Sequence, residues 1–169
     1  FNMCRPLELV FSNGMDKGVQ LGPKTGEVSE FKTFEQFNEA YQTQMNHFIR
    51  CLVNCINSID YAHKERCPLP FESSMVDGCL EKGKSLQEGG AKYNFSGPQG
   101  FGVANIADAM WAVKTLVYDE KKYTLEFYKE AVDNNYGEDM DQHHAEKLTK
   151  EVVKKLAKEK GSVTEDEVK

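Results

Sequence analysis

The sequence predicts a mainly α-helical fold with short strands. Over long stretches the apolar residues recur at steps of three and four, which is the spacing of one helix face. Capping signals stand directly before two of these stretches. One glycine-rich stretch, residues 84–102, interrupts the helical pattern and favours extended structure. The elements that follow are expected in this order along the chain.

A short amphipathic helix is predicted over residues 6–11, and a loop follows it. The loop is marked by four evenly spaced glycines, after which no glycine occurs until Gly78: Gly14, Gly18, Gly22 and Gly26. Because glycine is the usual residue of tight turns, this stretch is expected to lack long regular structure.

The strongest helix signal covers residues 34–64. Thr33 and Gln36 form a capping box at its start. Its apolar positions recur at steps of three and four, and they are Phe34, Phe37, Tyr41, Met45, Phe48, Leu52, Ile56 and Ile59. Such a helix is about 45 Å long, whereas a compact globule of this chain length has a diameter of about 40 Å. We therefore expect the helix to belong to a larger assembly of elements.

The middle of the chain is predicted to contain one shorter helix and then an extended region. Pro68 and Pro70 precede a helix over residues 71–82, which Gly83 closes. In residues 84–102, strand-compatible side chains surround Tyr93 and Phe95 among several glycines. Such a region is typical of a strand or loop whose backbone passes close to another segment.

The last third of the chain returns to helices. A helix is predicted from Val103, and Thr124 is expected to cap another over residues 125–134. Gly161 would end a helix of residues 141–160, and Thr164 with Glu167 forms a further capping box close to the last residue. Since the chain also begins with Phe1 rather than methionine, residues 1–169 are expected to be part of one domain that is truncated at both ends.

Composition and charge narrow the classes of function. The formal net charge of −6 and the absence of an apolar run of about 20 residues argue against nucleic acid and membrane as partners. The five cysteines are odd in number and form no C-x-x-C pair. A disulfide framework is therefore not expected, and the predicted location is the cytoplasm.

No metal or nucleotide site is predicted. His47, Cys51 and Cys55 share one helix face, but three ligands over two turns span about 12 Å and cannot all reach one ion. His63 with Cys67 would supply only two ligands. The glycine run of residues 97–102 lacks the Gly-Lys-Ser/Thr of a P-loop, and Asn105 replaces the last glycine of a dinucleotide fingerprint. His143 and His144 are expected on a solvated face.

Five blocks of the chain, in this order, resemble the glycyl radical enzymes of the pyruvate formate-lyase superfamily. They are Phe1-Asn2 with Leu7-Glu8-Leu9, the Asn13-Gly14 turn, residues 67–74 (CPLPFESS), residues 89–100 (GGAKYNFSGPQG) and residues 102–108 (GVANIAD). The blocks are most similar to the dehydratase, lyase and decarboxylase branch. The resemblance implies that the chain is a segment of the ten-stranded α/β barrel of these enzymes.

The resemblance also implies a radical mechanism whose principal residues are not in these 169. In the family a glycine in a run like Arg-Val-Ala-Gly-Tyr stores a radical and passes it to a cysteine in a loop like Gly-Cys-Val-Glu. Neither motif occurs here, so no catalytic residue is assigned and the segment alone is expected to be inactive. Cys4 and Cys67 lack the neighbouring glutamate, and we expect both to be small buried hydrophobic residues.

The implied function is the cleavage of C–O, C–S or C–C bonds in a small polar substrate by an anaerobic enzyme. Within this segment Glu88 and Asn94 are the candidate substrate-binding residues, although Glu88 could instead lie on the barrel rim or pair with Lys92. The resemblance implies a radical S-adenosylmethionine activating enzyme with an iron-sulfur cluster, which installs the glycyl radical, and a homodimer. The alternative is a non-catalytic helical scaffold or interaction protein, which the long helix at 34–64 would suit.

Overall fold

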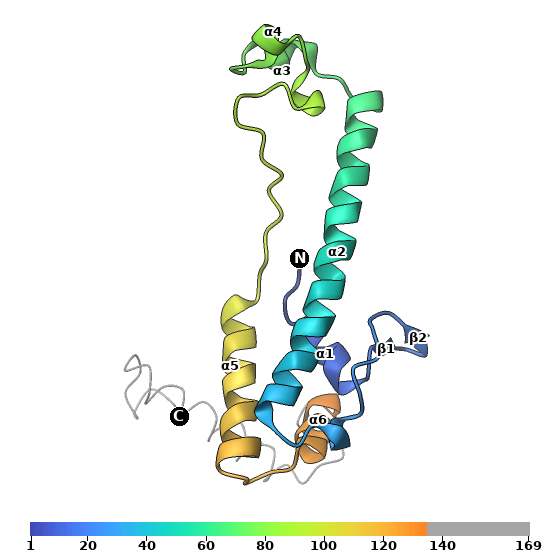
Figure 1. Cartoon of the computed structure of the whole chain (residues 1–169), viewed down its shortest axis with the longest axis vertical. Coiled ribbons are helices and arrows are strands. Elements are labelled where there is room, and N and C mark those ends of the chain that lie inside the picture. The colour runs from blue at the N-terminus through green and yellow to red at the C-terminus, as the bar shows by residue number, and fades with distance from the viewer. Residues whose placement is uncertain (135–169) are drawn as a thin grey trace, which may run out of the picture. The chain divides into compact units, whose positions relative to one another are not determined.

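The computed structural model describes residues 1–134 (Figure 1). In chain order its elements are the helix α1 (Arg5–Phe11), the strands β1 (Met15–Asp16) and β2 (Val19–Gln20), the 3-10 turn η1 (Val28–Glu30), the helices α2 (Phe34–Arg66), α3 (Pro70–Ser74) and α4 (Cys79–Lys82), the 3-10 turn η2 (Leu86–Glu88), the helix α5 (Val103–Val113), the π-helix η3 (Lys114–Asp119) and the helix α6 (Leu125–Asp133). The predicted helix of residues 141–160, the capping box of Thr164 and Glu167, and the histidines at 143 and 144 lie outside the described residues.

The described chain divides into two compact units. The packed unit comprises Asn2–Gln44 and residues 102–134, and the open unit comprises Phe1 and Met45–Phe101. Helix α2 contributes its first eleven residues to the packed unit and the rest to the open unit. The prediction of a mainly helical fold with short strands is confirmed, and the described residues by themselves form no barrel. No described helix combines the length and apolarity that a membrane crossing requires.

The packed unit is built around an aromatic core. Phe37 is completely buried, and its ring lies 5.6 Å from that of Phe11 and 6.0 Å from that of Phe31. Tyr128 of α6 stacks on Phe11 from the other side at 6.0 Å. Apolar residues of α1, η1, α2, α5 and α6 complete this core: Leu7, Val10, Val28, Ala40, Ile106, Val113 and Leu125. These elements therefore share one apolar cluster, to which α2 contributes only through residues 34–41.

The loop after α1 contains a short hairpin that the sequence analysis missed. Strands β1 and β2 pair in antiparallel register, with Met15 opposite Gln20 and Asp16 opposite Val19. The two turn residues, Lys17 and Gly18, both have positive φ, at 46° and 82°. This is the geometry of a type I′ turn, and a lysine at the first turn position gives little sequence signal for it.

The start and length of α2 confirm the predicted helix of residues 34–64. The Gln36 N–H donates to Thr33 Oγ1 at 3.3 Å, and the Thr33 N–H donates to Gln36 Oε1 at the same distance. These two reciprocal bonds are the predicted capping box. The helix ends at Arg66, directly before Cys67 and Pro68.

The predicted helix over residues 71–82 is wrong, because two short helices replace it. Helix α3 ends at Ser74, and α4 begins only at Cys79. Between them Gly78 adopts φ of 95°, and a Cβ there would lie 2.7 Å from the backbone nitrogen of Lys92. The close approach of residues 90–92 therefore sets a left-handed residue that a continuous helix does not allow.

The remaining helices follow the predictions. Helix α5 begins at Val103 and passes into the π-helix η3 without a break. Thr124 caps α6 as expected, since its Oγ1 accepts the Phe127 N–H at 3.2 Å. The stretch 84–102 forms no strand longer than a single bridge residue: the 3-10 turn η2 occupies its first part, and residues 94–100 have no regular secondary structure.

Candidate functional site

Glu88, the first predicted substrate contact, caps its own 3-10 turn. One carboxylate oxygen, Oε2, accepts hydrogen bonds from the Ser85 N–H at 3.2 Å and the Ser85 hydroxyl at 3.3 Å. The other, Oε1, lies 3.9 Å from the Lys64 ammonium, so Lys64 rather than Lys92 is its ion-pair partner. The backbone hydrogen bond from Ser85 lowers the pKa of Glu88, with smaller contributions from the Ser85 hydroxyl and from Lys64 and Lys84. The side chain is exposed and ionised at neutral pH, which makes it a weak base.

Asn94, the second predicted contact, begins the irregular stretch of residues 94–100. Its amide group lies close to the backbone of Gly89, where a Cβ would be 3.4 Å from Nδ2. Gly89 has φ of 76° and ends η2, the turn that Glu88 caps. The structure therefore brings both predicted residues to one turn of the open unit, with Asn94 exposed to solvent.

The far end of this stretch pairs with the first residue of the chain. The Phe1 amino group donates to the Gln99 carbonyl at 2.8 Å, and the Phe101 N–H donates to the Phe1 carbonyl at 3.1 Å. One residue that bonds to both neighbours of its partner is the pattern of parallel strands. The beginning of the chain and residues 99–101 therefore run side by side in the same direction.

Cys4 and Cys67, the two cysteines compared above with the catalytic thiol of the family, have different surroundings. Cys4 is half-buried in the packed unit, and its thiol donates to the Gly102 carbonyl at 3.7 Å. Cys67 is exposed, so the prediction that it is a buried hydrophobic residue is wrong. It lies directly between the end of α2 and Pro68. All five cysteines are free.

His47 and Cys51 are neighbours on α2, as their spacing predicts. The His47 Nε2 and Cys51 Sγ atoms are 3.7 Å apart, and Cys51 is exposed. Within residues 1–134 no group of three histidine, cysteine or acidic side chains is close enough to hold one metal ion.

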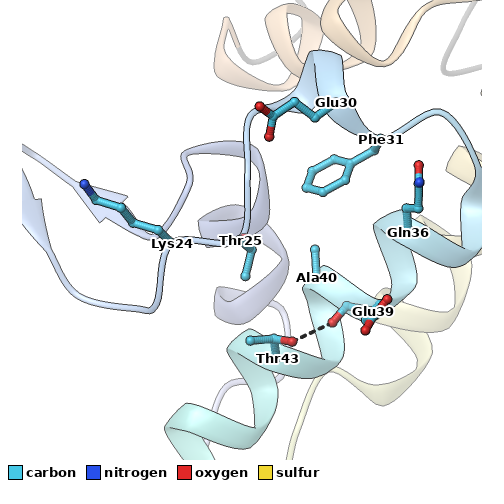
Figure 2. A pocket seen from close by; sticks show the side chains of 8 residues that line it. All are labelled: Lys24, Thr25, Glu30, Phe31, Gln36, Glu39, Ala40 and Thr43. Carbon is cyan, nitrogen blue, oxygen red and sulfur yellow. Dashed lines mark hydrogen bonds between the residues drawn. The ribbon is translucent and has the colours of Figure 1, made fainter.

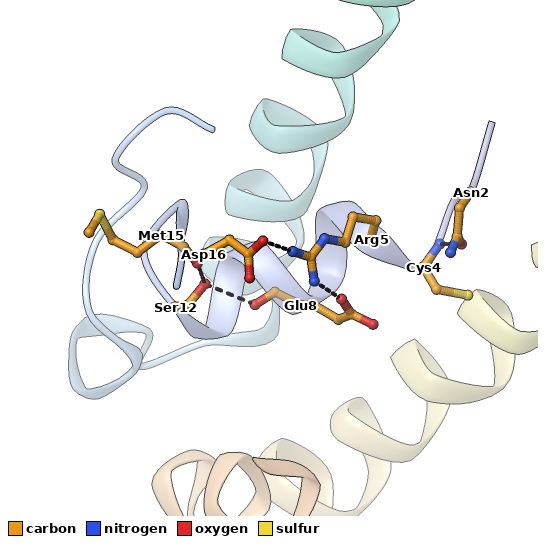
Figure 3. A network of polar contacts seen from close by, with 7 residues as sticks. All are labelled: Asn2, Cys4, Arg5, Glu8, Ser12, Met15 and Asp16. Carbon is orange, nitrogen blue, oxygen red and sulfur yellow. Dashed lines mark hydrogen bonds and ion pairs between the residues drawn. The ribbon is translucent and has the colours of Figure 1, made fainter. Parts of the chain in front are cut away.

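The N-terminal end of α1 carries an ionic network that the sequence analysis did not identify (Figure 3). The Arg5 guanidinium bonds to Glu8, one turn along the helix, and to Asp16 of β1 at 2.6 Å. The hydrogen bonds that the guanidinium donates to Glu8 and Asp16 raise the pKa of Arg5. Ser12 adds a bond from its hydroxyl to the Met15 carbonyl at 2.6 Å. The network fixes the hairpin against α1 and is a structural feature rather than a reactive one.

Asn13, in the loop after α1, also holds this region together through its side chain. It has a left-handed backbone, with φ of 51°, and its Oδ1 accepts from the N–H groups of Thr25 and Gly26 at 2.8 and 3.0 Å. Its Nδ2 donates to Glu27 at 2.9 Å. Asn13 therefore closes the loop between α1 and η1 through three hydrogen bonds, and the Asn13-Gly14 pair was the sequence signal for it.

A polar pocket of about 420 Å³ lies in the packed unit between this loop and the first turns of α2 (Figure 2). Its lining is Lys24, Thr25, Glu30, Phe31, Gln36, Glu39, Ala40 and Thr43. Glu30 also accepts the Glu27 N–H at 3.0 Å, and Thr43 donates to the Glu39 carbonyl at 2.9 Å. The pocket holds carboxylates and hydroxyls but neither a thiol nor a histidine, so it has no obvious nucleophile–base pair.

Comparisons with known proteins identify the family of the chain. The pyruvate formate lyase-like family matches residues 1–160. The chain is 50% identical to a structure of 1,2-propanediol dehydration in Roseburia inulinivorans, with a TM-score of 0.81, covering 88% of this chain and 19% of that one. It is 53% identical to the glycerol-bound B12-independent glycerol dehydratase from Clostridium butyricum, with a TM-score of 0.77. That match covers 80% of this chain and 17% of the dehydratase chain.

Among curated proteins, the chain is 36% identical to the (2S)-3-sulfopropanediol dehydratase of Klebsiella oxytoca over 137 residues, or 80% of this chain. The chain spans about 17% of the length of that relative. The family match covers most of the chain, and the relatives include dehydratases, lyases and decarboxylases of the glycyl radical type. The chain therefore belongs to the pyruvate formate lyase-like family, and it corresponds to a segment of a glycyl radical enzyme.

Proposed function

We propose that this chain is part of a glycyl radical dehydratase that eliminates water from a small vicinal diol such as propane-1,2-diol or glycerol. The observation that carries the proposal is a difference in identity among solved structures. The two diol dehydratases are 50% and 53% identical to this chain, whereas the hydroxyproline dehydratase and the glycyl radical enzyme from Archaeoglobus fulgidus are 31% and 30% identical. The same family match favours an enzyme over the helical scaffold considered above.

The proposed reaction follows from the radical chemistry of the family. A thiyl radical takes a hydrogen atom from the carbon that bears one hydroxyl group. The C–O bond of the adjacent carbon then breaks, and its hydroxyl leaves as water with the proton that the first hydroxyl gives up as its own carbon becomes a carbonyl. Return of the hydrogen atom from the thiol gives an aldehyde and restores the thiyl radical. The cysteine and the radical glycine are proposed to lie in the parts of the polypeptide outside these 169 residues.

This segment is proposed to contribute to the framework of that site and not to its reactive groups. The parallel pairing of Phe1 with residues 99–101 supports a place in a sheet, since parallel strands occur almost always in larger, covered sheets. Both units are proposed to be parts of one barrel domain. Glu88 and Asn94 stay the proposed substrate contacts, and the ionised state of Glu88 favours a role as hydrogen-bond acceptor for a hydroxyl.

The partners are proposals as well. The intact enzyme is proposed to be a cytoplasmic homodimer that works without oxygen. A radical S-adenosylmethionine activating enzyme is proposed to install its glycyl radical. With that activating enzyme, the segment of 169 residues alone should give no glycyl doublet in electron spin resonance. A doublet on the segment would contradict the placement of the radical glycine elsewhere.

The experiment is a substrate comparison on the intact, anaerobically activated enzyme. Propane-1,2-diol, glycerol, isethionate and trans-4-hydroxy-L-proline are supplied separately, and the carbonyl product is trapped and quantified. We expect turnover of at least one diol and none of the other two. Turnover of isethionate or hydroxyproline with no product from either diol would overturn the proposal. The Asn94→Ala variant should raise KM for the diol more than it lowers kcat if Asn94 contacts the substrate.

A further inference from the structure

A second pocket, of about 340 Å³, lies wholly within the packed unit, and its charge is unlike that of the chain as a whole. It is bounded by η1, the C-terminal half of η3 and the first turn of α6. Its lining is Val28, Ser29, Phe31, Lys32, Val117, Tyr118, Lys121, Lys122, Tyr123, Thr124, Leu125 and Glu126. Three lysines and one glutamate line it, although the chain has a formal charge of −6. The pocket is thus a local positive site on an acidic protein.

The backbone after the π-helix places these lysines. The Glu120 N–H donates to the Thr115 carbonyl at 2.8 Å, and the Lys122 N–H donates to the Leu116 carbonyl at 2.9 Å. Between them Lys121 adopts a left-handed conformation with φ of 51°. A lysine with positive φ is uncommon. Here the turn that contains Lys121 places both Lys121 and Lys122 in the pocket lining.

The rest of the lining forms an apolar and aromatic wall. Phe31 and Leu125 are buried in the aromatic core, and the half-buried Val117 packs against that core. The Tyr118 hydroxyl donates to the Phe31 carbonyl at 3.1 Å, which ties η3 to η1 across the pocket. The Lys122 ammonium lies 5.7 Å from the centre of the Tyr123 ring, a cation–π distance. The wall is therefore held by contacts within the described residues.

We propose that this pocket binds a small organic anion whose carboxylate or phosphate group contacts Lys32 and Lys121 and whose apolar body lies against Phe31 and Val117. The volume falls in the range of about 300–1,000 Å³ that is usual for small-molecule pockets. Lysine is a common phosphate ligand, and the positive end of α6 adds to the potential at the same place. The ligand is an anion, whereas the proposed diol substrate is neutral, and the pocket lining includes neither Glu88 nor Asn94.

The test is a binding measurement on the intact enzyme before activation, with phenyl phosphate as the probe. Isothermal titration is compared for the wild type, the double variant Lys32→Gln/Lys121→Gln, and the control Lys17→Gln, whose lysine lies in the hairpin turn away from the pocket. We expect saturable binding that the double variant weakens by roughly tenfold or more, that the control leaves unchanged, and that weakens as salt is added. Inorganic phosphate should bind more weakly than phenyl phosphate, since it has no apolar body.

Several results would overturn the proposal. These are no saturable binding by a folded wild-type enzyme, an equal loss in the control variant, or unchanged binding in a double variant whose circular dichroism and melting temperature match the wild type. An acidic side chain from the remaining polypeptide that fills the pocket would give the first of these results. Because the readout is binding and not turnover, its outcome is independent of whether the enzyme dehydrates diols.

Discussion

The interactions that stabilise the packed unit internally differ from those that stabilise the open unit internally. The packed unit buries large side chains such as Phe37, Val10 and Val113 in a continuous core. Among the described residues of the open unit, the buried side chains are confined to the small ones of Ser73, Cys79 and Ala91. Most of its aromatic residues are exposed instead, with 76% of Phe71 and 85% of Phe95 accessible.

Hydrogen bonds take the place of a core in the open unit. The Ser73 hydroxyl donates to the Leu69 carbonyl at 2.6 Å and accepts the Leu86 N–H at 2.9 Å. The Lys82 ammonium donates to the Ala91 carbonyl at 2.8 Å, and the Lys92 N–H donates to the Asp77 carbonyl at 2.7 Å. Such bonds set local geometry but contribute only about 1 kcal/mol each to stability. The difference teaches that one unit carries its own apolar burial, whereas the other exposes apolar residues that a larger fold would cover.

The largest expected effect tests that difference directly. Phe37→Ala in the segment should cost about 3–5 kcal/mol in the free energy of unfolding, because a completely buried aromatic ring is lost. Phe95→Ala should cost less than about 0.5 kcal/mol, since the ring is exposed. Urea unfolding followed by circular dichroism measures both. Equal costs for the two variants would remove the distinction between the units.

The cost of Phe95→Ala in the full enzyme can be compared with its cost in the segment. If the remaining polypeptide covers the open unit, Phe95→Ala in the full enzyme should cost about 3 kcal/mol, several times its cost in the segment. The segment alone should also bind an apolar dye, and replacing Phe71 and Phe95 by serine should reduce that fluorescence. A sharp, cooperative melt of the segment without dye binding would count against this expectation.

A glycine in each unit provides the next comparison. A Cβ on Gly22 of the packed unit would lie 2.0 Å from Oε1 of the fully buried Gln44, whereas a Cβ on Gly97 of the open unit would meet no atom within 4 Å. Gly22→Ala should therefore cost about 1–3 kcal/mol, because Gln44 would have to give up its bond to the Pro23 carbonyl. Gly97→Ala should be neutral or slightly stabilising. Thermal melts of the two variants decide this, and a neutral Gly22→Ala would show that the loop over Gln44 can move.

Tyr118 gives a smaller effect with a defined pH dependence. Burial, with a smaller contribution from the charge of Glu126, raises the pKa of Tyr118 from 10.0 to about 12. A phenol whose folded pKa is raised stabilises the fold fully below pH 10, and that contribution is lost as the pH rises towards 12. Tyr118→Phe should lower the free energy of unfolding by about 1 kcal/mol at neutral pH, because the hydrogen bond to the Phe31 carbonyl is lost. The variant should also lose less stability than the wild type as the pH rises above 10, since it has no phenol to ionise. Urea unfolding at a series of pH values measures both effects.

The corresponding carboxylate in the open unit should have the smallest effect. The pKa of Glu88 lies below its ordinary value of 4.5, so its capping bonds stabilise η2 above that pH and are lost as the pH falls through the lower folded value. Glu88→Gln should speed hydrogen exchange at the Ser85 amide near neutral pH while the melting temperature changes little. A large drop in melting temperature would mean that Glu88 contributes to more than its own turn.

Sequence reasoning located the elements that depend on local signals. The capping boxes and apolar spacing gave α2 and α6 almost to the residue, because a cap and a helix face are read within a few residues of each other. The family resemblance was confirmed from blocks of residues in order. The resemblance also included the Asn13-Gly14 turn, and both of these residues have positive φ, at 51° and 79°.

Features that depend on residues far apart in the chain were decided only by the tertiary structure. The break between α3 and α4 arises because residues 90–92 approach Gly78, and the ion pair of Glu88 is with Lys64, 24 positions earlier. The lysine pocket joins η1 to η3 and α6, and its charge is apparent only when these segments meet. The sequence by itself determined where helices start and which family the chain resembles, because those signals are local. Which side chains are covered, paired or gathered at a pocket depends on long-range contacts that no short window of sequence contains.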